Sequence, residues 1–323
     1  MPDLVSIDAS TFDLVHDLIG DLFGFSASEV VGLLAPPWSD PETSPGWILH
    51  EDDRAVGFLG AVTVDRHIDG EPFRFCNLTT WYVEPEHRGS SLAMMRPPLR
   101  LDGHVVTDFS PSVEAERISL RLGFQELETS TRLFEPETKQ SSTLTVTPGH
   151  LGVLGALGPT ERQIVSDHQW IPTCRWYVAR DGDAACLIVA SKSTIHRRPY
   201  LRIDHVSNPE LFVEHADGIV ATMQTTEGVS TVFAGNRFTW SRGATCARLL
   251  PDRTVALVAN PGNLNPEQID NLYSEVMLLD ITTVPKSLPP TRAYQARQAV
   301  QIALWRMRQV KRAAGRLVTR RTE

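Results

Sequence analysis

The chain lacks the features that mark several common classes of protein. It has four cysteines in 323 residues, and Cys76, Cys174, Cys186 and Cys246 form no CxxC pair. Neither a disulfide framework nor a zinc site is therefore expected, and we predict no metal. No Walker loop, GxSxG motif or HExxH motif is present. These absences argue against the familiar nucleotide hydrolases, serine hydrolases and zinc proteases.

Long apolar runs are also missing. No stretch approaches the roughly 20 residues needed to cross a bilayer, and residues 1–4 lack the basic start of a secretory signal. We therefore expect a cytoplasmic protein, with a peripheral position at the inner membrane face left open by its basic end. The 41% hydrophobic and 22% charged residues are a globular mixture, and the length suits two domains.

Positive charge is scarce in most of the chain and concentrated at its end. The formal charge is −8 overall, but residues 286–323 hold ten Lys or Arg and one acid, so this segment is +9 and the rest −17. Nucleic acid, DNA included, is therefore not expected as the main partner of the folded part. Apolar residues recur every three or four positions over 291–317, which predicts an amphipathic basic helix. Docking on the acidic body or on an acidic partner is favoured over a membrane surface.

The first half predicts helices and consecutive antiparallel strands. An acidic turn and an Asp69-Gly70 turn separate three strand-like segments, and a polar loop containing glycine follows the third. Beyond this loop the hydrophobic period changes. The expected order is a strand at 4–7, a helix over 12–22, a proline-rich loop over 36–45, strands at 47–50, 55–68 and 73–83, a loop and helix, a strand at 105–108, a helix near 113–122 and two strands around Phe124 and Leu133.

The second half repeats part of this pattern. With Trp176 aligned to Trp47, segment 176–190 matches segment 47–61 at a constant offset of 129 residues, each with a polar turn and a preceding helical segment. Duplication explains this match better than chance does. The polar stretch 136–148 suits a linker. The expected units are a first domain over 1–137, a second domain over 138–285 and the basic helix over 286–323.

The most informative residues follow the strand at 73–83. They read Trp81-Tyr82-Val83-Glu84-Pro85-Glu86-His87-Arg88-Gly89-Ser90-Ser91-Leu92-Ala93. Small residues at a helix start let a pyrophosphate approach the backbone N–H groups and the positive end of the helix dipole. Arg88 could add charge-assisted hydrogen bonds, although an arginine in a turn is more often merely solvated.

In its strand and helix context this segment resembles the phosphate-binding signature of the GNAT superfamily of acyl-coenzyme A N-acyltransferases. That signature is a strand ending in Val-x-Pro, then Arg or Gln, two residues, Gly, one residue, and Gly or Ala. Arg88 and Ala93 match it, and Ser91 departs from it. The resemblance implies acetyl-CoA or a longer acyl-CoA as cosubstrate. It implies a cofactor site made of Tyr82, Val83, Arg88, Gly89, Ser90, Ser91, Leu92 and Ala93.

A second landmark strengthens the resemblance. A helix opening near Ser112 closes in Leu122-Gly123-Phe124, and Leu-Gly-Phe commonly closes the same element in the superfamily, although a glycine there is common in any protein. Many relatives have a tyrosine as general acid five residues before the Phe, and here that residue is Ser119, a much poorer acid. The strand 76–82 also lacks the carboxylate that relatives often keep.

Catalytic residues are therefore left unassigned, with Tyr82, Asp108 and Ser119 as candidates. Glu84 and His87 are interpreted as surface residues, and Asp108 also suits a helix cap. Pro97-Pro98 predicts that the helix after the loop stops after about two turns. The second half passes from its strand 200–206 through Ser207-Asn208-Pro209 directly into a helix, without a phosphate loop. It is expected to bind no coenzyme A, and to close an acceptor cleft or stabilise the first half.

The resemblance predicts an α/β fold of two tandem GNAT-like domains, with mixed, mostly antiparallel sheets flanked by helices. The predicted function is transfer of an acyl group from acyl-CoA to a small-molecule amine. Segments 77–83 and 269–275 resemble, more weakly, bacterial GNAT-like proteins of cell-surface polysaccharide synthesis, which suggests an amino sugar as acceptor. Two alternatives stay open: a non-catalytic acyl-CoA-binding or scaffold protein, and a tRNA-dependent aminoacyl transferase of the peptidoglycan-bridge type, which the acidic body disfavours. Acceptor, acyl length and oligomeric state are not predicted.

Overall fold

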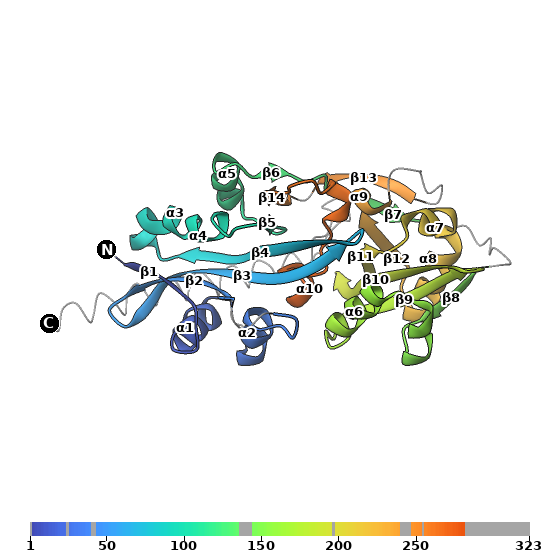
Figure 1. Cartoon of the computed structure of the whole chain (residues 1–323), viewed down its shortest axis with the longest axis horizontal. Coiled ribbons are helices and arrows are strands. Elements are labelled where there is room, and N and C mark those ends of the chain that lie inside the picture. Colours follow the sequence, from blue (N-terminus) through green and yellow to red (C-terminus); the bar gives the residue numbers. More distant parts are fainter. Residues whose placement is uncertain are drawn as a thin grey trace.

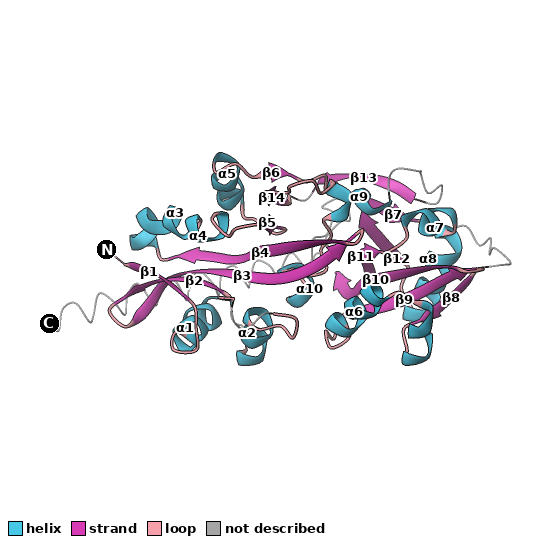
Figure 2. Cartoon of the chain, in the orientation of Figure 1, coloured by secondary structure: helices cyan, strands magenta, loops and turns pink. Residues whose placement is uncertain are grey.

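The computed structural model describes residues 2–23, 26–39, 43–135, 144–195, 198–239, 247–253 and 255–281. In this part of the chain two mixed seven-stranded sheets lie one after the other along the long axis, with helices on their faces (Figures 1 and 2). This arrangement confirms the predicted fold class. The predicted basic helix over 286–323 lies outside the described residues. No described helix is long and apolar enough to span a membrane.

The first sheet begins with four consecutive antiparallel strands and a parallel fifth. Its first two turns confirm the predicted hairpins, because Asp52, Asp53, Asp69 and Gly70 all have the positive φ angles that two-residue turns of this type require. Helices α1 (Phe12–Phe23) and α2 (Ala27–Leu34) pack on β3. The strands are β1 (Asp3–Ser6), β2 (Gly46–Glu51), β3 (Arg54–Ile68), β4 (Glu71–Val83) and β5 (His104–Asp108).

The connection from β4 to β5 is made of short helical turns. A 3₁₀ helix, η1 (Pro85–Ser90), leads into α3 (Ser91–Met94) and α4 (Arg96–Leu99). The helix after the loop, α3, ends at Met94 after one turn, because Pro97 and Pro98 lack the N–H groups that would continue it; about two turns are expected from the sequence. Both prolines lie in the first turn of the next helix, α4. There the missing N–H groups would have had no intrahelical partner, so proline is tolerated. Helix α5 (Val113–Arg121) follows β5, with Ser112 as its N-cap.

The second sheet repeats the order of the first. Its four antiparallel strands are again followed by helices and a parallel strand. The end of the expected linker, 145–148, is itself a strand. The elements are β8 (Thr145–Pro148), the 3₁₀ helix η2 (Leu151–Ala156), α6 (Pro159–His168), β9 (Cys174–Asp181), β10 (Ala184–Ile195), β11 (Arg198–Val206), α7 (Pro209–Glu214), α8 (Ala216–Glu227), β12 (Thr231–Gly235) and α9 (Asn236–Thr239).

The two sheets exchange one strand each. Strand β14 (Leu257–Ala259) enters the first sheet between β5 and β6 (Gln125–Glu126), and β7 (Ser130–Phe134) enters the second between β12 and β13 (Ala247–Arg253). The expected final strand pair of the first half is therefore wrong, because its two members lie in different sheets. The reason is burial. The apolar β14 suits a position between two strands, whereas the polar β6 suits an edge.

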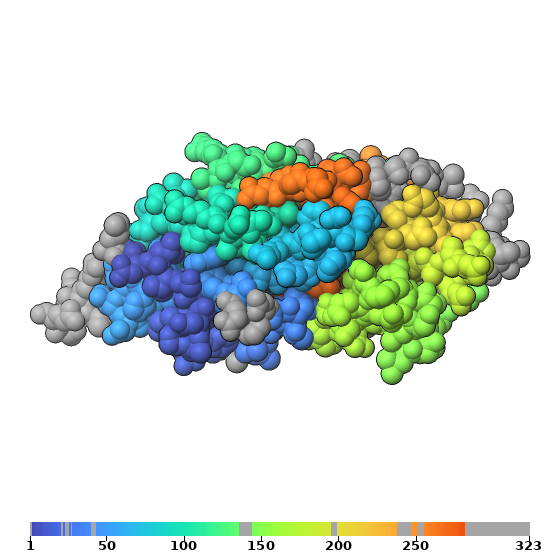
Figure 3. Space-filling view, viewed as in Figure 1, coloured from blue at the N-terminus to red at the C-terminus, as the bar shows by residue number. Residues whose placement is uncertain are grey.

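The exchange is accompanied by a shared core. One cluster of buried residues joins Val64, Phe75 and Val105 of the first sheet to Val178 and Leu187 of the second. The segment that ends the described chain contributes to the same cluster, and in Figure 3 its orange surface lies against the cyan and teal surface of the first half. A cut at residue 137 would separate β7 and β14 from the sheets in which they pair.

Candidate active site

The two parallel strands of the first sheet separate part-way along their length. β4 and β5 pair from Arg74 with His104 to Asn77 with Thr107, and no further. Thr80 has a φ of 52° and the β3–β4 register shifts nearby, which marks a β-bulge. Along residues 78–81, β4 has a strand partner only on the β3 side in the described part of the chain. We call this opening the β4–β5 fork.

The loop after β4 holds most of the sequence-predicted cofactor residues. Arg88, Gly89 and Leu92 are exposed, and a Cβ atom built on Gly89 would meet nothing within 4 Å. The Ser91 hydroxyl donates to the Arg88 carbonyl oxygen at 2.8 Å, which closes the turn between η1 and α3. Met94 is buried and fixes this turn to the core. The loop therefore presents an exposed arginine and small residues on an anchored base.

Two titratable residues of the loop have structural partners. Glu84, expected at the surface, is 2% exposed, because its carboxylate accepts from both terminal nitrogens of Arg54 at 3.0 Å. His87 Nε2 lies 3.4 Å from a carboxylate oxygen of Glu51. Both contacts tie the loop to the β2–β3 turn. Glu84 is thus held as a positioning residue and not as a proton acceptor.

A carboxyl group from the second half lies at the base of the β4–β5 fork. Glu275 begins α10 (Glu275–Leu278), which packs against β4 and α2. Its backbone N–H donates to Asn77 Oδ1 at 3.2 Å, and the Ser110 hydroxyl donates to its Oε1 at 2.7 Å. The Ser110 N–H donates to Asp108 Oδ1 at 3.3 Å. We call Asp108 and Glu275 the fork carboxyls.

The environment of the fork carboxyls favours their neutral forms. Burial and the charge of Asp108 raise the pKa of Glu275 to about 8. Burial raises the pKa of Asp108 to about 7, although the Ser110 N–H acts in the opposite sense. Interacting carboxyls titrate as a pair. Near neutral pH the pair therefore holds about one proton, so one member can accept a proton and the other can donate one.

The structure treats the three catalytic candidates differently. Asp108 reaches Glu275 through Ser110 and does not cap a helix, because the cap of α5 is Ser112, whose hydroxyl accepts from Ala115. Tyr82 packs against the core under α1 and α2. Ser119 is 1% exposed, and its hydroxyl has no hydrogen-bond partner among the described residues. Only Asp108 of the three belongs to the fork carboxyls.

Comparison with solved structures identifies the architecture around this fork. GCN5-related N-acetyltransferases from Anabaena variabilis and Kribbella flavida match with TM-scores of 0.55 and identities of 13% and 14%, over 80% of this chain and 72% and 70% of theirs. The chain shares the fold of these acetyltransferases. A conserved Enterococcus faecalis protein of unknown function matches similarly, with a TM-score of 0.54, 11% identity and coverages of 80% and 72%. No protein-family model and no curated protein sequence matches the chain.

A pocket of about 660 Å³ lies between the tip of the β3–β4 hairpin and α6. At its floor, Arg66 donates to both oxygens of Asp270 at 3.0 and 2.7 Å, and His205 Nδ1 lies 2.9 Å from the same carboxylate. Burial acts to raise the pKa of Asp270, but Arg66 and His205 lower it below its usual value. Carboxylates outnumber arginines in the lining: Asp65, Asp69, Glu161, Asp167, Glu210, Glu267 and Asp270 against Arg66 and Arg237.

The polar residues that the sequence singled out on β11 are divided between sites. His205 lines this pocket. Arg202 and Asp204 form a buried ion pair at 2.6 Å, and Tyr200 stacks on Phe233 with ring centroids 5.2 Å apart. His205 therefore lines the pocket of about 660 Å³, and Arg202 lines a smaller cavity together with Phe109 of the first half.

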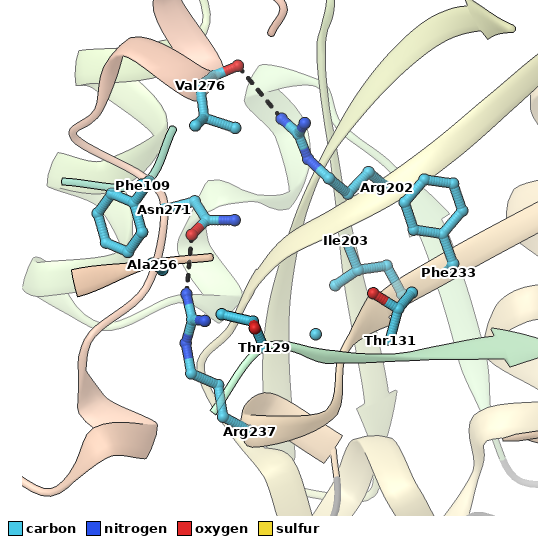
Figure 4. Close-up of a pocket in the computed structure, with 11 residues that line it drawn as sticks. Phe109, Thr129, Thr131, Arg202, Ile203, Phe233, Arg237, Ala256, Asn271 and Val276 are labelled. Carbon is cyan, nitrogen blue, oxygen red and sulfur yellow. Dashed lines mark hydrogen bonds between the residues drawn. The ribbon is translucent and has the colours of Figure 1, made fainter. Parts of the chain in front are cut away.

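Two buried arginines hold the segment that carries Glu275. Figure 4 shows them beside a small cavity of about 40 Å³, with Arg237 directed at Asn271 and Arg202 at Val276. Arg237 donates to the Asn271 side chain at 2.8 Å, and Arg202 donates to the carbonyls of Val276 at 3.3 Å and Ile281 at 2.9 Å. The second half therefore fixes the position of α10, and with it the position of Glu275 at the base of the β4–β5 fork.

Among the described residues, no group of three His, Cys, Asp or Glu side chains is arranged to hold a metal ion. The group that sequence reasoning missed is Glu275. Its partner Asn77 lies 198 residues away in the sequence, and segment 269–275 carries a family resemblance but no catalytic motif. No local pattern distinguishes this glutamate from an ordinary helix-start acid.

Proposed function

We propose that this protein is an N-acyltransferase that moves an acyl group from acyl-coenzyme A to an amine. The observation that carries the proposal is the β4–β5 fork, which opens beside the loop at 84–94 and has two carboxyl groups at its base. The fold shared with acetyltransferases supports the same activity.

The fork fits the shape and chemistry of acyl-CoA. The pantetheine arm is an extended chain with two secondary amides, so it can pair with the backbone of residues 78–81 as an added strand would. From Asn77 to Val83 a strand rises roughly 20 Å. That span is comparable with an extended pantetheine arm. A pyrophosphate at Arg88 and the small residues of the loop thus brings the thioester to the base of the fork.

For the acceptor we propose a cationic amine such as an amino sugar. The excess of carboxylates in the pocket of about 660 Å³ attracts an ammonium group. The same segment of the second half contributes Asp270 and Tyr273 to this pocket and Glu275 to the fork. A role in cell-surface polysaccharide synthesis rests on the sequence resemblance alone.

The test is calorimetric titration of acetyl-CoA and longer acyl-CoA esters into the protein and into Arg88→Glu. Reversing this charge places an acid against the pyrophosphate, so we expect binding to weaken at least tenfold. Arg74→Glu is the matched control, because it reverses the charge of an exposed arginine at the other end of β4. Equal affinity in all three proteins would remove the loop from the cofactor site, and no binding of any ester would overturn the proposed function.

A non-catalytic acyl-CoA-binding protein is the second candidate. It is favoured by Ser119, which stands where many relatives of this fold have a tyrosine acid and is buried without a partner among the described residues. Release of the coenzyme A thiol, followed with a thiol reagent in the presence of amines, separates the two functions. Binding without amine-dependent thiol release identifies the binding protein.

A further inference from the structure

We propose that the second half supplies an acid–base group to the first: Glu275, acting with Asp108, exchanges the protons of acyl transfer at the base of the β4–β5 fork. The inference rests on the proposed function and names the groups that perform its chemistry. It also gives the half without a phosphate loop a direct part in the reaction.

The hydrogen bonding of Glu275 supports this assignment. The side chain is 0% exposed, Oε1 accepts from Ser110, and Oε2 has no hydrogen-bond partner in the described part of the chain. A buried carboxyl oxygen without a partner is costly, so a purely structural acid would be expected to have one. Asp204, an equally buried acid, does, because Arg202 and Ser191 each donate to one of its oxygens at 2.6 Å.

The groups around Glu275 make Asp108 its electrostatic partner. Asn77 from β4 and Ser110 from the β5–α5 connection contact it and carry no charge. Arg202 from β11 binds the next carbonyl along, that of Val276, but its charge is balanced by Asp204.

The buried residues of α2, the helix that contacts α10, are apolar: Val30, Leu33 and Leu34. The approach of a second carboxylate therefore disfavours full ionisation of the fork carboxyls, and burial acts in the same direction.

The proton balance of the reaction fits a pair that shares one proton. The ammonium group of the acceptor first loses one proton to solvent. The neutral nitrogen then attacks the thioester carbon, and the carboxylate member of the pair accepts the second proton that leaves the nitrogen. The carbon–sulfur bond then breaks, and the carboxyl member gives its proton to the departing thiolate. The products are the amide and the coenzyme A thiol, and the pair returns to its starting state with one proton.

This assignment predicts a bell-shaped dependence of the transfer rate on pH. Well below pH 7 both fork carboxyls are protonated and no base is available. Well above pH 8 both are ionised and no acid is available. Glu275→Gln should abolish one limb of the profile, since only Asp108 still titrates in the fork.

The first experiment needs no knowledge of the acceptor. Acetyl-CoA binding is measured by calorimetry at pH 7.5 in two buffers of different ionisation enthalpy, which gives the protons exchanged on binding. A thioester placed against the fork carboxyls changes their protonation, so we expect less proton exchange with Glu275→Gln, in which only Asp108 titrates, than with the native protein. Glu214→Gln is the control, because this exposed glutamate of the second half lies outside both the fork and the pocket of about 660 Å³.

The second experiment measures transfer from acetyl-CoA to glucosamine, spermidine and lysine methyl ester. Loss of general acid–base catalysis typically lowers the rate by about 10² to 10⁴-fold, which we expect for Glu275→Gln with unchanged acetyl-CoA affinity. Glu275→Asp should restore part of the rate. Proton exchange and pH profile unaltered in Glu275→Gln would overturn the inference while leaving the proposed function intact. Failure of the native protein to bind acetyl-CoA would overturn both.

Discussion

In each sheet two parallel strands separate part-way along their length, and the buried acids at the two forks differ in their hydrogen bonding. In the first sheet β4 and β5 part after Asn77, and in the second β11 and β12 part after Ile203. The residue that follows in the second sheet is Asp204, whose carboxylate is fully paired with Arg202 and Ser191. The first fork holds Glu275, whose Oε2 has no partner among the described residues.

The difference shows how a duplicated fold can divide its tasks. The second fork holds a buried ion pair beside a small cavity of about 40 Å³, and β11 is followed after two residues by α7, so there is no loop for a phosphate. Its Arg202 instead holds α10, which carries Glu275 into the first fork. The first half therefore keeps the β4–β5 fork and the loop after β4, while the second half holds α10 in place and contributes Glu275.

The largest effect on stability is expected from removing the Arg202–Asp204 ion pair of the second fork. Asp204→Ala leaves the Arg202 guanidinium buried without its carboxylate, which should lower the free energy of unfolding by about 3–5 kcal/mol. Urea denaturation measures the change. Asp183→Ala, in an exposed turn, should alter stability by no more than about 0.5 kcal/mol. A loss below 1 kcal/mol for Asp204→Ala would contradict the role given to this ion pair.

In the first fork, replacing the carboxyl group of Glu275 should instead preserve stability as pH rises. The pKa of Glu275 is raised above its unfolded value, so its contribution to stability is present at acid pH and is lost as pH rises through about 8. The native protein should therefore lose on the order of 3 kcal/mol more than Glu275→Gln between pH 5 and pH 8. Parallel stability curves for the two proteins would show that Glu275 ionises normally.

A smaller change sharpens the comparison within the first fork. Ser110→Ala removes a hydrogen bond to Glu275, which should cost about 1 kcal/mol and raise the pKa of this carboxyl further. Ser112→Ala is the matched control. It removes the cap of α5 at a similar cost of about 1 kcal/mol, but leaves the pKa of Glu275 in place. The pH at which stability levels off, measured for both variants, distinguishes them.

The smallest effect is expected at Ser119. Its buried hydroxyl has no partner in the described chain, so Ser119→Ala should change stability by less than about 0.5 kcal/mol, or increase it slightly. Thermal unfolding tests this. A loss of acyl transfer in this variant without a loss of stability would instead give the hydroxyl a part in the chemistry.

Much of the fold could be predicted because its signals are local. Alternating strands and the Asp69-Gly70 turn appear within a few residues of sequence, and the repeat at Trp47 and Trp176 is visible at one offset. The strand exchange is not. β7 and β14 are five and three residues long, and each pairs with strands about a hundred residues or more away in the sequence. Nothing in so short a segment specifies which sheet it will join.

The same limit applies to the site. The spacing from Arg88 to Ala93 is a local pattern that the sequence displays, whereas the structure alone joins Asp108 to Glu275. Glu84 was misjudged because its partner Arg54 lies on another strand, 30 residues earlier. Burial of a charge depends on such distant partners, so sequence reasoning underestimates it.

Because of the exchanged strands, the first sheet cannot be completed until β14 of the second half has been synthesised. Strand β6 leaves the ribosome long before β14, which must enter the sheet between it and β5. At 5–20 residues per second the intervening chain takes between about 7 and 27 s to make. During that time the edge of β5 that pairs with β14, at Val106, Thr107 and Asp108, lacks its neighbour. The first sheet of this protein is thus begun first but completed only after most of the second half has been made.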